Sequence, residues 1–193
     1  MSDVLTTQQR HANMAAIHGK DTKPEMIVRH WLWARGYRYR LNHPRLPGKP
    51  DIVLRKYRTC IFVNGCFWHG HHTQFIMHDS KFMIESSGCC KIPKTNRAFW
   101  IDKIRRNQER DSRVQRELAS MGWHSITVWE CELKGARRES TLESLAFTLN
   151  KIFLLNFSTQ AQSEDSQDHG VIRRYELPEE EPMMAAEDTH KNR

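Results

Sequence analysis

Five side chains that could bind a soft metal ion lie in the middle of the sequence. They are Cys66, His71, Cys89, Cys90 and Cys131. A closed structural zinc site takes four Cys or His ligands in a tetrahedral array, so four of these residues would tie two loops and the end of a strand together. The spacings are not those of a standard zinc finger, and the alternative is a set of buried free cysteines and surface histidines. We predict a structural zinc site.

Charge is unevenly distributed along the chain. The 193 residues carry a net charge of +7, yet residues 158–193 contain four Lys or Arg against nine Asp or Glu. Residues 1–157 therefore hold 26 basic against 14 acidic side chains. A basic body with an acidic tail indicates a polyanionic partner such as nucleic acid. The alternative is a soluble protein with a positive surface.

Length and composition indicate one folded domain over residues 1–157. Residues 158–193 are rich in Ser, Gln, Glu and Pro, so we expect a disordered acidic tail there. No run approaches the roughly 18 apolar residues of a transmembrane helix, and no apolar segment near the N-terminus indicates a secretory signal. An odd number of cysteines argues against a disulfide framework. We expect a cytoplasmic protein that does not contact a membrane.

The spacing of apolar residues predicts a mixed α/β fold. The clearest helix start is Thr22-Lys23-Pro24-Glu25, a capping box with Pro in the first turn, and Gly36 would end this helix. Further helices are expected over Thr7–His18, Asn96–Met121 and Thr141–Phe157, and strands over Tyr37–Leu41, Asp51–Leu54, Thr59–Val63 and Trp123–Trp129. This order predicts a mixed sheet flanked by helices.

Asp51 opens an apolar strand directly after a turn, Leu46-Pro47-Gly48-Lys49-Pro50. A carboxylate at a sheet edge beside a basic surface suits Mg²⁺, which takes one or two carboxylates together with water and phosphate oxygens. The alternative, which the tetrapeptide Pro50–Val53 taken alone favours, is an aspartate that stabilises the turn.

Aromatic residues gather in the same part of the chain. Phe67 and Trp68 are neighbours among the possible metal ligands, and Phe99-Trp100 opens the long helix. Exposed aromatics beside a basic face can wedge between base pairs and bend a duplex. A small loop core is the alternative, and for two adjacent aromatics alone it is the commoner outcome.

Several motifs, taken in order, resemble the very short patch repair (Vsr) DNA mismatch endonucleases. They are Leu46-Pro47-Gly48-Lys49-Pro50-Asp51, Ile61-Phe62-Val63-Asn64-Gly65-Cys66-Phe67-Trp68-His69, Ile92-Pro93-Lys94-Thr95-Asn96, Phe99-Trp100, Asn107 through Arg110-Asp111, and Val128-Trp129-Glu130-Cys131. The resemblance runs from about Asn13 to Gly135, and Gly-Cys-Phe-Trp-His is its most specific part.

This resemblance implies a restriction-endonuclease-like fold with a structural zinc ion. It also implies Mg²⁺-dependent nicking of double-stranded DNA immediately 5′ of the T in a T·G mismatch. Such mismatches arise when 5-methylcytosine deaminates within the target of a cytosine-5 DNA methyltransferase. A monomer associated with a bacterial-type nucleoid is expected.

The resemblance assigns roles to individual residues. Asp51 would bind Mg²⁺ together with the main-chain carbonyl of Val63. His69 would be the general base for the attacking water, since histidine exchanges protons near neutral pH. Asp111 would be its acidic partner. Glu25 matches an acidic residue near the same site, and this role is compatible with its place in the capping box.

Further roles follow for the metal and DNA sites. The zinc ligands would be Cys66, His71, Cys131 and either Cys89 or Cys90. The aromatic wedge would be Phe67, Trp68 and Trp100. The DNA contacts would be Met14 and Ile17 from the minor groove, with Lys103 and Asn107 near the mismatch or its backbone.

The sequence departs from the family pattern at two places. Asn64 stands where reference members carry His, and Asn can orient water but cannot exchange a proton. An insertion, roughly Thr73–Ser87, precedes Cys89 and makes the fourth zinc ligand ambiguous. It also places Phe75, Met77, Phe82 and Met83 beside the DNA-facing loop.

Three functions are compatible with these features. The leading hypothesis is a Mg²⁺-dependent mismatch-nicking endonuclease. The second is a site-specific restriction-type nuclease without mismatch preference. The third is a zinc-stabilised DNA-binding protein without catalysis. Asp51 with His69 favours an enzyme, and the aromatic residues favour a mismatch reader.

Overall fold

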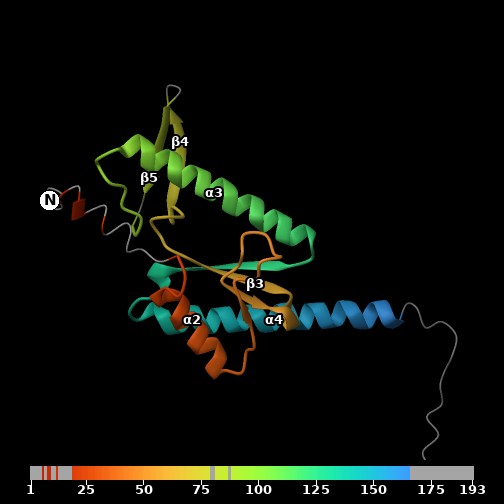
Figure 1. Cartoon of the computed structure of the whole chain (residues 1–193). Helices are drawn as coiled ribbons and strands as arrows, with labels where there is room; N and C mark the ends of the chain where they lie inside the picture. The colour runs from red at the N-terminus through yellow and green to blue at the C-terminus, as the bar shows by residue number, and fades with distance from the viewer. Residues whose placement is uncertain are drawn as a thin grey trace, which may run out of the picture. The chain divides into compact units, whose positions relative to one another are not determined.

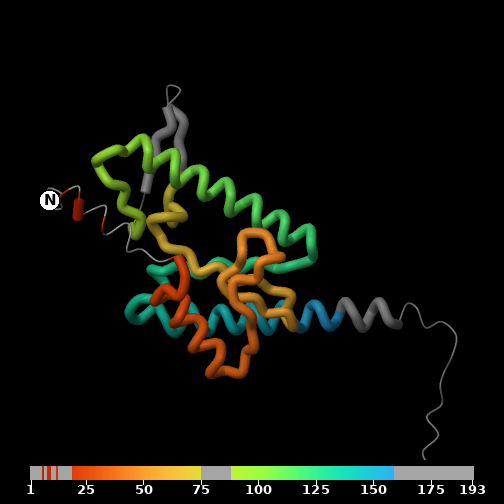
Figure 2. Tube along the Cα trace, viewed as in Figure 1, coloured from red at the N-terminus to blue at the C-terminus, as the bar shows by residue number. Residues whose placement is uncertain are grey.

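A computed structural model of the chain describes residues 6, 8, 9 and 12 and the ranges 19–78, 81–86 and 88–165 (Figure 1). Figure 2 gives the Cα trace in the same view. Met14 and Ile17, most of the helix expected over Thr7–His18, and residues 166–193 of the expected tail lie outside the described residues. In the described part of the chain, no helix is long and apolar enough to cross a membrane.

A four-stranded mixed sheet forms the centre of the unit that spans residues 1–157 (Figure 1). Its strands, in spatial order, are β1 (Arg40–Leu41), β2 (Ile52–Leu54), β3 (Thr59–Asn64) and β6 (His124–Trp129). The first two pairings are antiparallel, and β3 pairs with β6 in parallel from Thr59–His124 to Asn64–Trp129. The mixed sheet is therefore confirmed.

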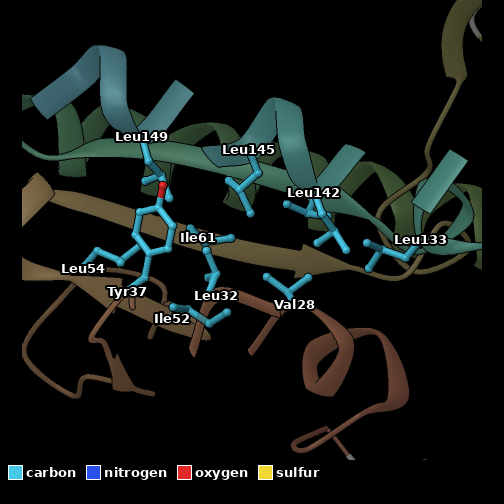
Figure 3. Packing of buried hydrophobic residues seen from close by; sticks show 11 residues of the cluster. Val28, Leu32, Tyr37, Ile52, Leu54, Ile61, Leu133, Leu142, Leu145 and Leu149 are labelled. Atoms are coloured by element: carbon cyan, nitrogen blue, oxygen red, sulfur yellow. The ribbon is translucent and has the colours of Figure 1, made fainter. Parts of the chain in front are cut away.

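Side chains alternate between the two faces of the sheet, as the pleat requires. One face carries Ile52, Leu54 and Ile61, which pack against α2 (Lys23–Ala34) and α4 (Arg137–Asp165). Figure 3 shows this core, with the leucines of α4 pointing toward the strands. Its labelled members are Val28, Leu32, Tyr37, Ile52, Leu54, Ile61, Leu133, Leu142, Leu145 and Leu149.

The opposite face of the sheet is covered by α3 (Arg97–Ser120). Val114 and Leu118 of this helix pack against Val53 and Cys60 of the strands. The sheet therefore has helices on both faces, and the predicted arrangement of a mixed sheet flanked by helices is confirmed. Because α3 connects two parallel strands, it must cross over the sheet, and this crossing brings its middle turns over the ends of β2 and β3.

The start of α2 follows the predicted capping box. The Thr22 hydroxyl accepts a hydrogen bond from the backbone N–H of Glu25, and Pro24 lies in the first turn. The Glu25 carboxylate in turn accepts from the backbone N–H of Asp21 at 3.1 Å. Gly36 follows the helix with a φ of +83°, a conformation that glycine adopts without strain.

A hairpin within residues 73–86 was not predicted as secondary structure. Strand β4 (Thr73–His78) pairs antiparallel with β5 (Lys81–Ser86), with Thr73 opposite Ser86. These residues correspond to the insertion relative to the family pattern. The element order therefore contains two more strands than expected.

Three predicted boundaries differ from the structure by more than one residue. The strand expected over Tyr37–Leu41 is reduced to β1, because its partner β2 has only three residues. The final helix α4 begins before Thr141, because its first turn consists mainly of charged residues that favour helix without an apolar pattern. At its other end the helix runs on to Asp165. Two short 3₁₀ turns, η1 (Arg55–Tyr57) and η2 (Glu130–Leu133), were also not predicted.

Candidate active site

A cleft of about 930 Å³ opens between the start of α2, the carboxyl end of β3 and the middle of α3. Its walls contain residues from five separate parts of the sequence. All five residues expected to be catalytic line it, together with Val63: they are Glu25, Asp51, Asn64, His69 and Asp111. Lys23, Lys49 and Arg110 add positive charge to the same walls, as a site for a phosphodiester requires.

Asp51 lies at the base of this cleft, immediately before β2. Its Oδ2 accepts a hydrogen bond from the backbone N–H of Val63 at 2.8 Å. Burial raises the pKa of the Asp51 carboxyl, and the nearby charge of Glu25 raises it further, whereas the Val63 N–H, Arg29 and His69 act to lower it. A cation would offset the cost of a buried carboxylate, and the remaining oxygen donors are of the kind that Mg²⁺ prefers.

Glu25 is held by three donors. Its carboxylate accepts from the Thr22 hydroxyl at 2.9 Å, from the backbone N–H of Asp21 and from Arg29 Nη2 at 2.7 Å. Glu25 and Arg29 are only 4% and 3% exposed, and Arg29 also pairs with Asp21. Glu25 is therefore fixed at the cleft wall with its charge largely compensated.

His69 and Asp111 form a pair in the same cleft. The imidazole Nδ1 lies 2.5 Å from Asp111 Oδ2, and both side chains are partly exposed. Burial by itself would raise the pKa of Asp111, but the hydrogen bond and charge of His69, with help from Arg110, lower it overall. An ionised Asp111 orients the ring and leaves Nε2 free to exchange a proton.

The loop that carries His69 is held against α3. Asn107 donates to the carbonyl of Trp68 at 2.7 Å, and Gln108 lies within hydrogen-bond distance of the carbonyls of His69 and Gly70. Gly70 has a φ of +62°, and a Cβ atom there would lie 2.5 Å from Ile104 Cγ2. Only glycine allows this close approach.

Four possible metal ligands come together beside the loop. The ligand atoms of Cys66, His71, Cys89 and Cys131 all lie within 4.8 Å of one another. The structure thus brings Cys89 to this cluster. Cys90 instead points into a separate core, where it packs near Ile104 and its thiol faces the Phe67 carbonyl.

The geometry of this cluster fits a tetrahedral zinc ion. His71 Nδ1 lies 3.7, 3.2 and 3.3 Å from the sulfurs of Cys66, Cys89 and Cys131. Zinc–ligand bonds of normal length at tetrahedral angles would place nitrogen and sulfur roughly 3.5 Å apart. Burial raises the pKa of the Cys66 thiol to about 12, and a bound cation would reverse this shift by stabilising the thiolate.

The three aromatic residues of the expected wedge form one cluster. The ring of Phe67 lies 5.1 Å from that of Trp68 and 5.0 Å from that of Trp100, in edge-to-face arrangements. All three side chains are half-buried, because each ring covers part of its neighbours, whereas a wedge ready to enter a duplex was expected to lie exposed. Phe99 continues the cluster and is 60% exposed.

Sequence comparison places the chain among known nucleases. Residues 2–75 match the family model described as "DNA mismatch endonuclease Vsr". The chain is 38% identical to the DNA mismatch endonuclease Vsr of Escherichia coli over 151 residues, which cover 78% of this chain and 87% of that protein. This chain belongs to the Vsr family of DNA mismatch endonucleases. The resemblance found in the motifs is thereby confirmed.

Other relatives are named as nicking enzymes. The chain is 47% identical to the type II nicking enzyme V.NmeAIP of Neisseria meningitidis over 136 residues, covering 69% of this chain and 86% of the relative. It is 40% identical to the type II nicking enzyme V.XorIIP of Xanthomonas oryzae pv. oryzae, covering 69% and 88%.

Membership in the Vsr family establishes the chemistry at a general level. The chain is an endodeoxyribonuclease, its substrate is DNA, and its fold is that of the restriction-endonuclease-like nucleases. The alternative of a DNA-binding protein without catalysis is therefore wrong. The cleft with its carboxylates and its imidazole is the region where phosphodiester hydrolysis has the groups that it needs.

Two residues expected to contact DNA differ in their surroundings. Lys103 is exposed on α3, where its charge is accessible. Asn107 is only 9% exposed, and its amide is already bonded to the Trp68 carbonyl. The hydrogen bond from Asn107 therefore positions the loop that carries Phe67 and Trp68.

Several residues of the site were not expected from the sequence. Nothing in the sequence pattern indicates that Arg29 or Gln108 belongs to the site, because a charged or amide residue within an amphipathic helix normally faces solvent. Lys49 and Glu130 line the cleft, and their place within the family motifs is the signal that points to them. Glu130 also pairs with Lys134 at 2.6 Å.

Proposed function

We propose that this Vsr-family chain nicks double-stranded DNA immediately 5′ of the T in T·G mismatches and requires Mg²⁺. The observation that carries this proposal is the convergence of Asp51 and the His69–Asp111 pair in one cleft, next to the loop that presents Phe67 and Trp68. The first three residues supply the groups for hydrolysis, and the aromatic residues supply a means to test base pairing.

Each side chain has a defined task in this reaction. Asp51 and the Val63 carbonyl would hold Mg²⁺, which supplies Lewis-acid stabilisation of charge on the scissile phosphate. His69 would accept the proton of the attacking water while Asp111 keeps its ring in the correct orientation. Glu25, with its remaining lone pairs, would orient water at the cleft wall. Asn64 would hold water by hydrogen bonds, because its amide cannot exchange protons.

The aromatic cluster would provide mismatch selectivity. A T·G wobble pair stacks less well than a Watson–Crick pair, so separating it from its neighbours costs less free energy. The rings of Phe67, Trp68 and Trp100 would insert into the duplex at the mismatch and stack on the bases exposed there. Met14 and Ile17 would approach from the minor groove, and Lys103 would contact the backbone near the mismatch.

The Cys/His cluster would hold a structural zinc ion. Cys66 and His71 come from the loop, Cys89 from the segment after the hairpin and Cys131 from η2. With four protein ligands, the ion has no open position for substrate, so its role would be to fix these segments together.

The biological setting follows from the proposed substrate. T·G mismatches form when 5-methylcytosine deaminates, so the chain would act together with a cytosine-5 DNA methyltransferase whose product it protects. We propose that it acts as a monomer, close to the DNA of the nucleoid. The nick would start the resynthesis of a short patch.

The decisive experiment compares T·G and T·A duplexes of the same sequence, each with Mg²⁺ or with EDTA. The proposal predicts nicking of the T·G duplex alone, in the presence of Mg²⁺. Nicking of both duplexes would instead support a site-specific nuclease without mismatch preference. This second candidate is favoured by the relatives that are named type II nicking enzymes. Nicking in EDTA would contradict the proposed use of Mg²⁺.

A further inference from the structure

The loop from Gly65 to Thr73 serves two sites at once. His69 lines the cleft, whereas Cys66 and His71 belong to the Cys/His cluster. Backbone hydrogen bonds within the loop join His69 to Gly65 and His71 to Cys66, at 3.2 and 2.9 Å. These bonds shape the loop internally, so the position of His69 in the cleft depends on contacts between the loop and other elements.

Gln108 of α3 makes such a contact with the loop backbone. Its Nε2 lies 3.3 Å from the carbonyl oxygen of His69, 3.0 Å from that of Gly70 and 3.1 Å from Thr73 Oγ1. Two amide hydrogens are therefore shared among three acceptors. Gln108 is half-buried. The Gly70 carbonyl also accepts from the backbone N–H and the hydroxyl of Thr73, at 3.1 and 2.6 Å. Loss of the Gln108 amide would therefore most affect the His69 carbonyl.

The packing around Gly70 shows how closely α3 approaches. A Cβ atom at this position would lie 2.7 Å from Gln108 Nε2 and 2.6 Å from Thr73 Oγ1. The glycine thus gives the amide access to two successive carbonyl groups of the main chain. Because Gln108 contacts the main chain of His69 and Gly70 directly, it restricts where the His69 side chain can lie.

The same helix holds the imidazole ring. Asp111 lies three residues after Gln108, on a neighbouring part of the helix surface. Its carboxylate contacts His69 Nδ1 at 2.5 Å. Helix α3 therefore contacts His69 twice, at the main chain through Gln108 and at the ring through Asp111.

We propose that Gln108 is a positioning residue for the nicking reaction. Its amide holds the main chain of His69 so that the ring, oriented by Asp111, faces the cleft at the distance that proton transfer requires. Gln108 acts through His69 and does not touch the substrate. This inference rests on the proposed role of His69 as the general base.

Three substitutions separate hydrogen bonding from packing. Gln108→Leu removes the donor and keeps the bulk. Gln108→Glu keeps the shape but places an oxygen against the carbonyl groups. Gln108→Lys keeps a hydrogen-bond donor at this position. In single-turnover assays on a T·G duplex, we expect the Leu and Glu variants to nick about 10- to 100-fold more slowly. The Lys variant should be faster than both, and the Kd for duplex and the zinc content should stay unchanged.

Control variants test whether the effect passes through His69. Ser112→Leu, at an exposed position one turn after Gln108, should nick within about twofold of the wild-type rate, since surface substitutions have small effects. Combining Gln108→Leu with Asp111→Asn should slow nicking by less than the product of the two single effects, because both act on one residue.

Two results would overturn the proposal: a folded Gln108→Leu protein that nicks at the wild-type rate, or single effects that multiply in the double variant. Should the Leu and Glu variants fail to fold, Gln108→Met carries the same expectation with less change in shape. Failure of the proposed function is distinguishable, because the wild type would then nick the T·A duplex as well, and failure of the proposed role of His69 would appear as nicking by His69→Ala. Loss of nicking in His69→Ala together with normal Gln108 variants would refute only the role of Gln108.

Discussion

The Asp51 carboxylate is needed for the proposed metal site, but its burial lowers the stability of the folded chain. Its carboxylate is partly removed from water, and burial raises its pKa. The folded chain therefore binds a proton on Asp51 more tightly than the unfolded chain does. Stability then falls as the pH rises from the ordinary pKa of aspartate to the raised value, and it stays lower above that range. A cation bound at Asp51 would remove this cost.

Asp51→Asn should separate the two effects. Asn can still accept the hydrogen bond from Val63 N–H, so the local structure should persist. In buffer without Mg²⁺ or chelator at neutral pH, we expect the variant to melt at a higher temperature than the wild type, and the difference should disappear in acid. Nicking should fall by on the order of 1,000-fold, because the Lewis acid contributes several kcal/mol. DNA binding should be nearly unchanged, and near-normal nicking with Mg²⁺ would show that Asp51 is not the metal ligand.

Asn64 is the residue at which this chain departs from the family pattern. It ends β3 and lines the cleft in a half-buried position, so a larger side chain can extend into open space. We therefore expect Asn64→His to fold and to nick within about threefold of the wild-type rate, as suits a surface-accessible change. Melting and nicking assays test this, and a folded but inactive variant would mean that Asn64 has a task specific to this chain.

At the scale of elements, α3 joins the aromatic cluster to the hydrolytic groups. Trp100, Asn107 and Asp111 recur along it at spacings of seven and four residues, so they lie on one side of the helix. The loop that faces this side carries Trp68 and His69 in adjacent positions. Base recognition and hydrolysis are therefore built on two segments that are bonded to each other.

Trp68→Ala tests the aromatic cluster. Loss of one stacking ring should reduce the binding preference for T·G over T·A duplex by roughly tenfold. The half-buried position implies an additional loss of about 1–2 kcal/mol of stability, because the ring also packs against Phe67 and Trp100. Binding titrations on both duplexes and thermal melts measure the two effects.

A matched control is Trp33→Ala, because Trp33 is 55% exposed on α2 and does not line the cleft. It should leave the T·G preference unchanged. If Trp68→Ala lowers the melting temperature but keeps the full preference for T·G, the cluster is a small core and does not read the mismatch.

The elements themselves were only partly predictable from local pattern. The capping box, the short apolar runs of β2 and β3 and the long α3 were apparent, because each depends on neighbours within a few residues. The hairpin of residues 73–86 was missed, and the start of α4 at Arg137 carries no apolar periodicity. The hairpin strands are specified by their pairing with each other, and the start of α4 by helix propensity. Neither of these can be recognised from the spacing of apolar residues.

At the scale of the whole molecule, the Cys/His cluster joins segments that are distant in sequence. Its members span from Cys66 to Cys131, and it adjoins both the aromatic loop and the end of β6. His71 stacks on Trp129 at 4.0 Å between ring centres, which ties the cluster to the sheet. Loss of the ion should therefore disturb the cleft as well as the cluster.

We expect one zinc ion per purified chain, and chelation should lower the melting temperature strongly. A structural zinc ion supplies on the order of 10 kcal/mol of folding free energy in small sites. Cys131→Ala should abolish zinc retention and give poorly folded protein. Cys90→Ala is the matched control, since Cys90 is buried but lies outside the cluster. It should keep one zinc ion, and a folded, active protein without metal would contradict a structural role.

The sequence by itself was sufficient for the fold class, the charge of the DNA-binding body and the family. Alternation of apolar residues specifies which face of a strand is buried, and a capping box specifies a helix start, so both can be recognised without a structure. The motif from Gly65 to His69 identified the family, because several specific residues occur there in fixed order.

The tertiary structure alone decided which residues meet. His69 and Asp111 are 42 positions apart, and His71 and Cys131 are 60 apart. Only the crossing of α3 and the pairing of β3 with β6 brings them together. The same packing selects Cys89 over Cys90, buries Asn107 against the loop and places Gln108 on the main chain of His69. These outcomes depend on contacts between distant segments, and a linear pattern of residue types carries no information about such distances.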